Sequence, residues 1–248
     1  MFFTRKKPII INCYTDRAEV YNYFPVVPNK KIIPDWFKKL KAPYFKTPED
    51  TQINLKLCPG VTGLFKTGFT VPLWSDLFLA VGEKGSEQYR WQYSDCRSSI
   101  ETHGAEQYGN YANKTEYLHL KLISPWALHC DEPIEFLATE PFWSFKTLKN
   151  ISILSGVIQF KTQTDNNINM FLRREEAKQE ILLEAGTPIY TYVPLTERPI
   201  KVVTHLVSTE KMQNLKSVGY SMTFLNHYAK KMQLTKKRKC PYKFDVKE

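Results

Sequence analysis

The sequence has little glycine and little cysteine for its 248 residues, and it has no long apolar run. Its five cysteines are scattered and never form a Cys-x-x-Cys pair. This argues against a zinc site or a disulfide framework and predicts free thiols in a reducing compartment. No run approaches the ~18 apolar residues that a membrane span needs. The first residues place their basic side chains after apolar ones, unlike a signal peptide. We therefore expect a protein that is neither embedded in a membrane nor secreted.

Several catalytic motifs are also missing. The sequence contains neither of the glycine-rich loops that cradle phosphates, GxxxxGK(S/T) and GxGxxG. Cys130 follows His129, but neighbouring side chains on a strand point to opposite faces. The pair therefore does not indicate a nucleophilic cysteine beside its base. These gaps argue against P-loop enzymes, dinucleotide-binding enzymes and cysteine-dependent hydrolases.

Positive charge is abundant, and it is concentrated near the two ends of the chain. The net charge is +10. Residues 1–46 carry ten Lys and Arg against three acids, and residues 230–248 carry eight against two. These counts leave a net of −3 for the residues between them. Basic termini of this kind make weak contacts with polyanions, or they serve solubility alone. No base-reading motif accompanies the charge, so both interpretations stay open.

Alternating apolar and polar residues predict strands along most of residues 1–207. The clearest candidates are residues 6–14, 53–57, 77–81, 117–124 and 133–141. Residues 83–88 are expected to form a hairpin loop that leads into a returning strand. Pro125-Trp126 is expected to end the strand at residues 117–124. A proline-led helical turn is expected within residues 33–45.

The segment Ser155–Leu195 carries the strongest sheet pattern. Residues 156–162 and 168–174 are predicted to be two strands joined by a tight turn at Asp165-Asn166-Asn167, because Asp and Asn tolerate left-handed turn geometry. A second turn is predicted at residues 185–188. From Ser208 onward the apolar spacing becomes helical, and Gly219 is expected to interrupt the helix.

These patterns predict a mainly β protein, built as an antiparallel barrel or as jelly-roll-like sheets, with a C-terminal helical extension. Residues 1–207 would form the β-rich domain, either as one unit or as subdomains 1–115 and 116–207. Residues 208–234 would form the helical extension and residues 235–248 a basic tail. We expect the extension to attach to a protein partner or to a second copy of the chain, which would make a homo-oligomer.

Three runs occur in an order that resembles an uncharacterised protein family encoded by tailed bacteriophages, including marine ones. They are KLISPWALHCDEPIEFLATEP, SGVIQFKTQTDNNINMFL and EAGTPIYTYVPLTER, and the earlier LCPGVTGLFKTGFTVPLW is similar to the first half of that family. The similarity covers roughly residues 33–207. It implies a phage-type protein, located in the host cytoplasm or in the virion, and it implies no catalytic residue.

The Ser155–Leu195 segment also resembles part of the dUTPase and dCTP deaminase barrel. The Gly-Val-Ile-Asp strand of those enzymes corresponds to Gly156-Val157-Ile158-Gln159, so a neutral amide stands in place of the acid that activates water. A neutral amide cannot act as a general base. The triplet Arg97-Ser98-Ser99 is similar to their phosphate-contacting motif but lies too far before Gly156. The resemblance implies shared architecture without shared chemistry.

The stretch Asp95–Thr115 is polar, contains glycine and is long for a loop, so it is either functional or mobile. Its aromatic and amide side chains are typical of recognition surfaces. We take His103, Tyr108, Tyr111 and Arg97 as the candidate binding residues. The alternative interpretation is a mobile excursion of the chain.

One pattern suggests a metal. His129 and Asp131, together with the distant His205, have the residue types of the facial triad that holds Fe²⁺ in non-haem oxygenases, which often use 2-oxoglutarate. No arginine follows His205 at the distance where such enzymes bind the 2-oxoglutarate carboxylate. The alternative interpretation is a turn capped by Asp131 and a strand histidine.

The sequence therefore predicts a non-catalytic, phage-encoded binding or structural protein that needs no cofactor. Two enzymatic alternatives remain. One is a nucleotide-processing enzyme on a dUTPase-like barrel, and the other is an iron oxygenase that uses His129, Asp131 and His205.

Overall fold

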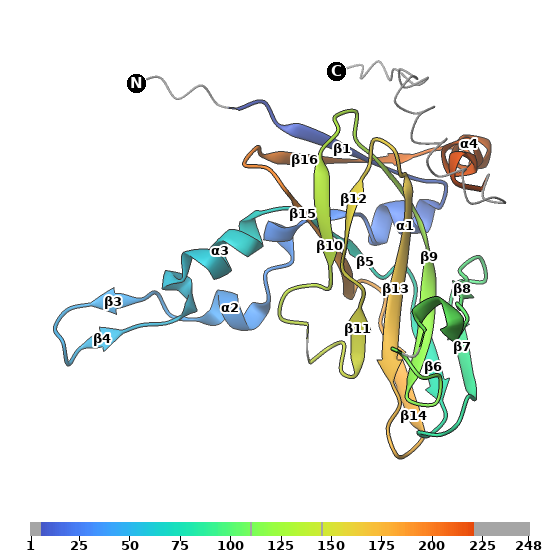
Figure 1. The fold of residues 1–248 in the computed structure, drawn as a ribbon. Helices are drawn as coiled ribbons and strands as arrows, with labels where there is room; N and C mark the ends of the chain where they lie inside the picture. The colour runs from blue at the N-terminus through green and yellow to red at the C-terminus, as the bar shows by residue number, and fades with distance from the viewer. Residues whose placement is uncertain (1–5, 110, 145, 221–248) are drawn as a thin grey trace.

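Strands dominate the computed structural model, which describes residues 6–109, 111–144 and 146–220 (Figure 1). They form three sheets around one hydrophobic core, together with a small separate hairpin. The predicted fold class is confirmed, because the chain is mainly β, with antiparallel, jelly-roll-like sheets and a helix that follows them. The sheets of the described residues are open, so the closed barrel is not the alternative that forms.

The first sheet has the strand order β11-β13-β9-β1-β16, and the short β8 also pairs with β9. β1 and β16 run parallel, whereas the other pairs are antiparallel. The strands of this sheet are β1 (Ile9–Thr15), β8 (Ile100–Glu101), β9 (Tyr117–His129), β11 (Ile151–Ile153), β13 (Asp165–Arg173) and β16 (Ile200–Leu206).

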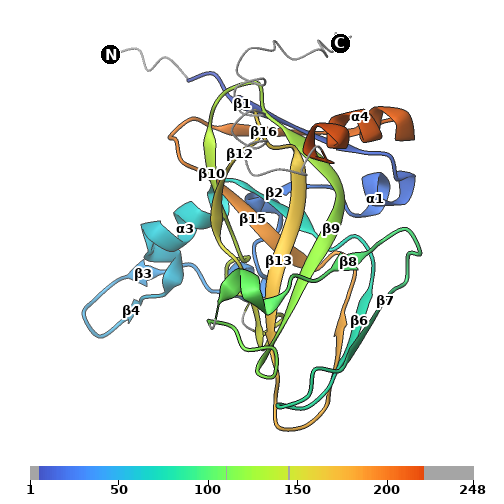
Figure 2. The same cartoon turned by 45° about the vertical axis from the view of Figure 1, so that its right-hand side comes forward.

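The second and third sheets are antiparallel. The second has the order β12-β10-β15-β5-β2 and the third the order β14-β6-β7. The strands of the second sheet are β2 (Val27–Pro28), β5 (Phe69–Pro72), β10 (Glu135–Thr139), β12 (Gly156–Gln159) and β15 (Pro188–Pro194). The strands of the third, which Figure 2 brings forward, are β6 (Leu77–Val81), β7 (Tyr89–Tyr93) and β14 (Gln179–Leu183).

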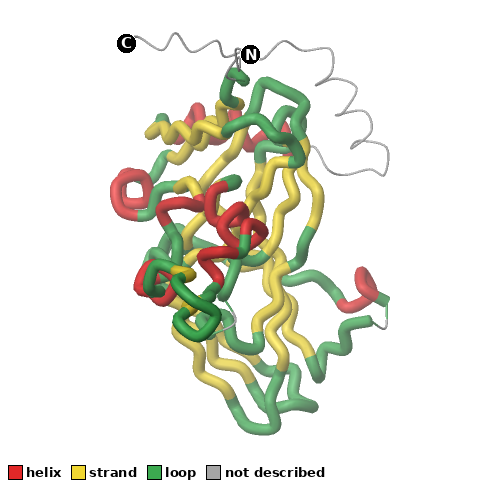
Figure 3. The backbone as a smooth tube through the Cα atoms, turned by 90° about the vertical axis from the view of Figure 1, so that its left-hand side faces the viewer, coloured by secondary structure: helices red, strands yellow, loops and turns green. Residues whose placement is uncertain are grey.

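Helices are short and lie outside the sheets. Figure 3 shows the hairpin and the helices of residues 35–66 in front of the strands. That hairpin consists of β3 (Tyr44–Phe45) and β4 (Thr51–Gln52). The helices are α1 (Ala18–Tyr23), η1 (Asn29–Lys31), α2 (Asp35–Lys39), η2 (Leu55–Leu57), α3 (Pro59–Lys66), η3 (Ala105–Tyr108) and α4 (Thr209–Tyr220).

Strand alternation builds the core. Leu118, Leu120 and Leu122 of β9 all point inward and are buried. Between the first and second sheets lies an aromatic cluster with ring centroids 5.1–6.1 Å apart, formed by Phe69, Phe136, Phe160 and Tyr192. Burying each such side chain contributes about 2 kcal/mol relative to leaving it in water. This packing fixes the strands that carry the site described below.

Several local predictions are confirmed. α2 and β10 lie within the residue ranges predicted for a helical turn and a strand, and β1 overlaps the strand predicted at residues 6–14, ending one residue later at Thr15. The loop at residues 83–88 joins β6 to β7, which pair in register. Gly186 sits in the predicted turn with a φ of 86°, a left-handed geometry that suits glycine.

The predicted strand at residues 53–57 is wrong. Asn54 caps the 3₁₀ helix η2 by accepting a hydrogen bond from the backbone N–H of Lys56. Pro59 then opens α3 at a position where its missing N–H costs nothing. Ile53, whose pattern suggested a buried strand face, is 69% exposed. Alternation alone did not distinguish this exposed turn from a half-buried strand.

Pro125-Trp126 does not end its strand, because β9 continues to His129. The register between β9 and β13 shifts between Asp165 and Asn167, so the ladder has an irregularity opposite Pro125. A proline is tolerated at such a bulge because no ladder hydrogen bond is required from it. Trp126 is completely buried and holds the strand in the core.

The predicted hairpin over residues 156–174 is also wrong. β12 pairs with β10 in the second sheet, whereas β13 pairs with β9 and β11 in the first. The turn lies earlier, where Gln159 accepts hydrogen bonds from the backbone N–H groups of Thr162 and Gln163. Asp165, Asn166 and Asn167 already belong to β13.

Within the described residues, the expected helical extension is present as α4. α4 runs through Gly219 without the expected interruption. It packs on the first sheet through Met212, which contacts Tyr14 and Ala127. The rest of the expected extension and the basic tail, residues 221–248, lie outside the described residues. Within the part of the chain that the structure describes, no helix combines the length and apolar character needed to cross a membrane.

Candidate functional site

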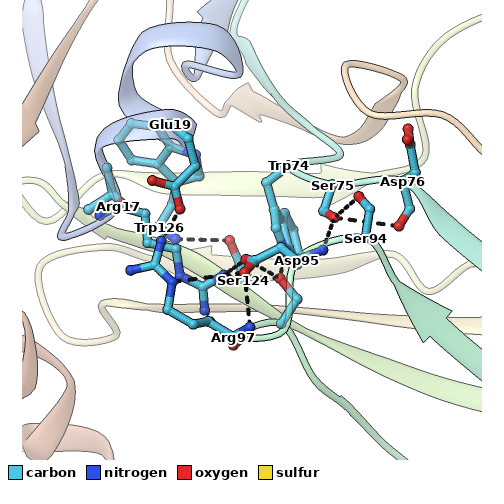
Figure 4. A network of polar contacts seen from close by, with 12 residues as sticks. Arg17, Glu19, Trp74, Ser75, Asp76, Ser94, Asp95, Arg97, Ser124 and Trp126 are labelled. Carbon is cyan, nitrogen blue, oxygen red and sulfur yellow. Dashed lines mark hydrogen bonds and ion pairs between the residues drawn. The ribbon is translucent and has the colours of Figure 1, made fainter.

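The stretch of residues 95–115, here called the covering segment, is fixed at its start by a partly buried ion pair (Figure 4). Nη1 of Arg17 donates to the Asp95 carboxylate at 2.5 Å and to Oγ of Ser98 at 3.0 Å. The side chains of Arg17 and Asp95 are only 13% and 19% exposed. The indole N–H of Trp74 donates to the same hydroxyl of Ser98 at 2.9 Å. The start of the segment is therefore tied to the chain before α1 and to the core.

Arg97 is placed by this same network and not by the pocket described next. Its guanidinium pairs with Glu19 of α1, and its backbone N–H donates to Asp95. Its side chain is half exposed. The structure therefore places this predicted binding residue in an ion-pair network near α1.

The covering segment closes over the outer face of β9 and β13 and leaves a pocket of about 210 Å³ beneath it. This is smaller than the roughly 300–1,000 Å³ typical of drug-sized sites, so the pocket suits a compact group. Residues from the segment, from β7 and from the first sheet line it. The lining includes Glu87, His103, Tyr108, Lys114, His119, Phe171 and Arg174.

His119 lies at the centre of the pocket wall. Alternation along β9 turns it away from the core, yet the covering segment leaves it only 6% exposed. Its Nδ1 accepts the backbone N–H of His103 at 3.2 Å, and its Nε2 lies 3.2 Å from Oδ1 of Asn169. These partners assign the neutral tautomer protonated at Nε2.

The surroundings also keep His119 neutral. Burial is the main reason why the pKa of His119 is lowered to about 4. The hydrogen bond with Asn169 raises this pKa, whereas the charges of His103 and Lys121 lower it further. Near neutral pH the imidazole is therefore uncharged, and both of its nitrogens are engaged. It is a poor candidate for a general base, because its lone pair is already used.

Aromatic rings surround His119. Its ring centroid lies 5.1 Å from that of His103 and 5.2 Å from those of Tyr108 and Phe171. Tyr108 meets Phe171 edge-on, at 5.0 Å and 76°. Burial raises the pKa of the Tyr108 phenol, which keeps it protonated. The cluster presents ring faces and edges to a ligand, an arrangement that suits a second ring.

Arg174 supplies a buried positive charge to the pocket, since the residue is only 4% exposed. Its Nε donates to the Lys114 carbonyl, and its Nη1 donates to the carbonyls of Gly82 and Gln88. Burial lowers the pKa of Arg174, and the charge of Glu87 opposes this effect. Among the described residues no carboxylate forms an ion pair with Arg174. Because all of these hydrogen bonds go to backbone carbonyls and none goes to a carboxylate, the guanidinium retains capacity for an anion.

The pocket unites two of the four predicted binding residues, His103 and Tyr108. Tyr111 is 91% exposed and does not line it. The sequence did not indicate His119, Phe171 or Arg174, because each reads as a solvent-facing position of a strand or its end. Their only common signal is that bulky or cationic residues occupy the outer face of two neighbouring strands.

The residues of the iron alternative are not gathered into a metal site. Nε2 of His129 lies 3.1 Å from Oδ1 of Asp131, whereas Nε2 of His205 lies 2.8 Å from Oδ1 of Asn12. Within the described ranges, no group of three His, Cys, Asp or Glu side chains could hold a metal ion. These three residues therefore do not fit a bound iron, and we derive no chemistry from one.

Gln159, which stands where the barrel enzymes hold an acid, lies on β12 opposite Glu135 of β10. It is at the edge of the second sheet and does not line the pocket. No protein-family model matches this chain, and no curated protein matches it either.

Proposed function

We propose that this chain is a non-catalytic binding protein whose pocket takes a compact ligand that joins a ring to an anionic group. The observation that carries the proposal is the buried guanidinium of Arg174, which has no carboxylate partner among the described residues, beside the aromatic cluster of His103, Tyr108 and Phe171. The ring of the ligand would pack on the aromatic cluster. Its carboxylate or phosphate would meet Arg174, with Lys114 at the rim.

The chemistry of the lining favours binding over catalysis. His119 is neutral and has both nitrogens engaged, and the Tyr108 phenol stays protonated. Neither side chain is prepared to take a proton from a substrate near neutral pH. Their hydrogen bonds and ring contacts instead hold a fixed shape for recognition.

Anchoring of the covering segment at both ends supports a preformed pocket. Arg17 fixes the start, and near the end the backbone N–H of Gly85 donates to the Thr115 carbonyl at 2.9 Å. In the middle, the backbone N–H of His103 holds the segment to His119. A preformed site loses less conformational freedom when a ligand binds, which favours affinity.

Matched ligand pairs test the charge requirement. We would titrate the full chain with benzoate and its neutral isostere benzamide, with glucuronate and glucose, and with deoxynucleoside monophosphates and the uncharged deoxynucleosides, using ligand-detected NMR and calorimetry. We expect at least one ring-bearing anion to bind about tenfold or more tighter than its neutral counterpart, since a charge-assisted hydrogen bond contributes about 1.5–3 kcal/mol. Equal affinity within every pair, or no binding by any ring-bearing anion, would contradict the proposal.

We further propose that the protein is encoded by a tailed phage and acts in the host cytoplasm or in the virion. The support is the ordered similarity of residues 33–207 to the phage family described above. Mass spectrometry of purified virions and of infected-cell lysate tests this. Peptides of this chain in either sample are expected, and their absence from both would contradict the proposal.

A further inference from the structure

Residues 30–66, here called the basic arm, project from the second sheet (Figure 1). The arm keeps many apolar side chains in water. The arm contains α2, the β3–β4 hairpin, η2 and α3. Phe37 and Phe65, with ring centroids 4.8 Å apart, are its buried pair. Seven other large apolar residues are 39–69% exposed: Trp36, Tyr44, Phe45, Ile53, Leu55, Leu57 and Leu64. So many exposed apolar residues in one segment indicate an interaction surface.

The arm is also strongly basic. It carries eight lysines against three acids, a net charge of +5. Two of those acids are already paired within the arm, Asp35 with Lys38 and Asp50 with Lys46. Lys39 and Lys41, by contrast, form no ion pair with any described residue. The expected partner surface is therefore apolar and acidic.

A surface of that kind lies on the same chain. On the outer face of the second sheet, Leu137 of β10 stands between Val157 of β12 and Val193 of β15 in register. Leu137 and Val157 are 37% and 61% exposed. Leu195, which directly follows the end of β15, is 54% exposed. Leu137, Val157 and Leu195 are here called the β10–β12 patch. The outer face of an antiparallel sheet is normally polar where it meets water, so this apolar patch indicates a surface that a partner covers.

Acidic residues border the β10–β12 patch. Glu135 lies two residues before Leu137 on the same face, and Glu140 follows the end of β10. Both are exposed, and neither forms an ion pair among the described residues. Residues 67–207 as a whole carry a net charge of −4, opposite in sign to the arm. The apolar character and the charge of the two surfaces are therefore complementary.

The two surfaces are close enough to belong to one interface. Trp36 of α2 contacts Trp143, which follows β10, with ring centroids 5.3 Å apart. A two-fold interface needs both complementary surfaces on one side of each molecule, so that each copy offers both to the other. We propose that two copies of this chain form a symmetric dimer in which the basic arm of each lies on the β10–β12 patch of the other.

A charge exchange tests this in the full chain by sedimentation velocity. Wild type is expected to be a dimer whose dissociation increases with salt, because the charge pairs are screened. Lys39→Glu with Lys41→Glu, and separately Glu135→Lys with Glu140→Lys, should each give monomers. Mixing the two variants should restore a dimer, because in the mixed pair both arm–patch contacts regain opposite charges.

An apolar substitution and its matched control complete the test. Phe45→Ser on the arm should weaken dimerisation at least tenfold, whereas Leu182→Ser on β14, at the similar exposure of 59%, should leave it unchanged. Circular dichroism confirms folding of every variant. A monomeric wild type, dimers that persist in both charge-reversed variants, or a mixture that stays monomeric would each overturn the proposal. All variants retain residues 208–248, so a dimer formed by the helical extension would survive both charge reversals.

Discussion

The covering segment and the basic arm are both excursions from the sheets, yet they use their aromatic side chains in opposite ways. The covering segment turns Tyr108 and His103 onto the sheet, where His119 and Phe171 receive them. The arm has one buried ring pair, Phe37 with Phe65, and leaves Phe45 in water. The surface beneath a segment thus decides whether its aromatic residues close a pocket or form a protruding surface.

The largest effect should come from the anchor of the covering segment. Arg17→Met removes the mostly buried partner of Asp95 and leaves that carboxylate only the half-exposed guanidinium of Arg97, whose Nε lies 3.8 Å away, so we expect a loss of about 3–5 kcal/mol in the free energy of unfolding. Arg97→Met, at a half-exposed ion pair, should cost less than about 1 kcal/mol. Urea denaturation measures both. Equal losses would mean that the buried pair does not anchor the segment.

The next effect compares one ring from each region. Phe171→Ala removes a side chain that is 9% exposed and supports the pocket, and we expect it to cost about 3 kcal/mol. Phe45→Ala on the arm should change the free energy of unfolding by less than about 0.5 kcal/mol. Both are measured by urea denaturation in the Lys39→Glu, Lys41→Glu background, so that dimerisation does not contribute. A large loss for Phe45→Ala would show that the arm packs on the body.

The pH dependence of stability reports on the pocket. The pKa of His119 is lowered from its ordinary 6.5 to about 4, so between these values the unfolded chain binds the proton more readily than the folded chain. Stability should therefore fall as the pH decreases from about 6.5 towards about 4. The fall should be shallower in His119→Gln, as measured by urea midpoints across that range. His205, whose pKa burial also lowers, contributes in the same direction in both proteins. Identical slopes would exclude His119 as a source.

The sequence predicted the fold class because alternation is a local signal. The pattern of Leu118, Leu120 and Leu122 is enough to place β9 in the core. The same signal does not tell which strand becomes the neighbour, so β12 and β13 looked like a hairpin although they belong to different sheets. The alternation that begins at Ile53 predicted a strand, but the residues form an exposed 3₁₀ turn whose apolar residues have the same spacing as those of a strand.

The site was only half predictable for a related reason. His103 and Tyr108 were indicated by the composition of a long polar segment. His119, Phe171 and Arg174 were not, because strand periodicity assigns their positions to solvent. Only the fold brings the covering segment over these side chains. His103, for example, contacts His119 although the two are 16 residues apart in the sequence. A pocket built on the outer face of a sheet leaves little trace in the local sequence.

The most direct test of the proposed function compares two tyrosines of the covering segment. Tyr108 lines the pocket, whereas Tyr111 is 91% exposed and lies outside it. The tightest ring-bearing anion would be titrated calorimetrically into wild type, Tyr108→Ala and Tyr111→Ala. We expect Tyr108→Ala to weaken binding about tenfold or more, since a ring contact is worth about 0.5–1.5 kcal/mol beyond its buried area, and Tyr111→Ala to match wild type. Equal affinities in all three proteins would contradict the account, because the ligand would then bind somewhere other than this pocket.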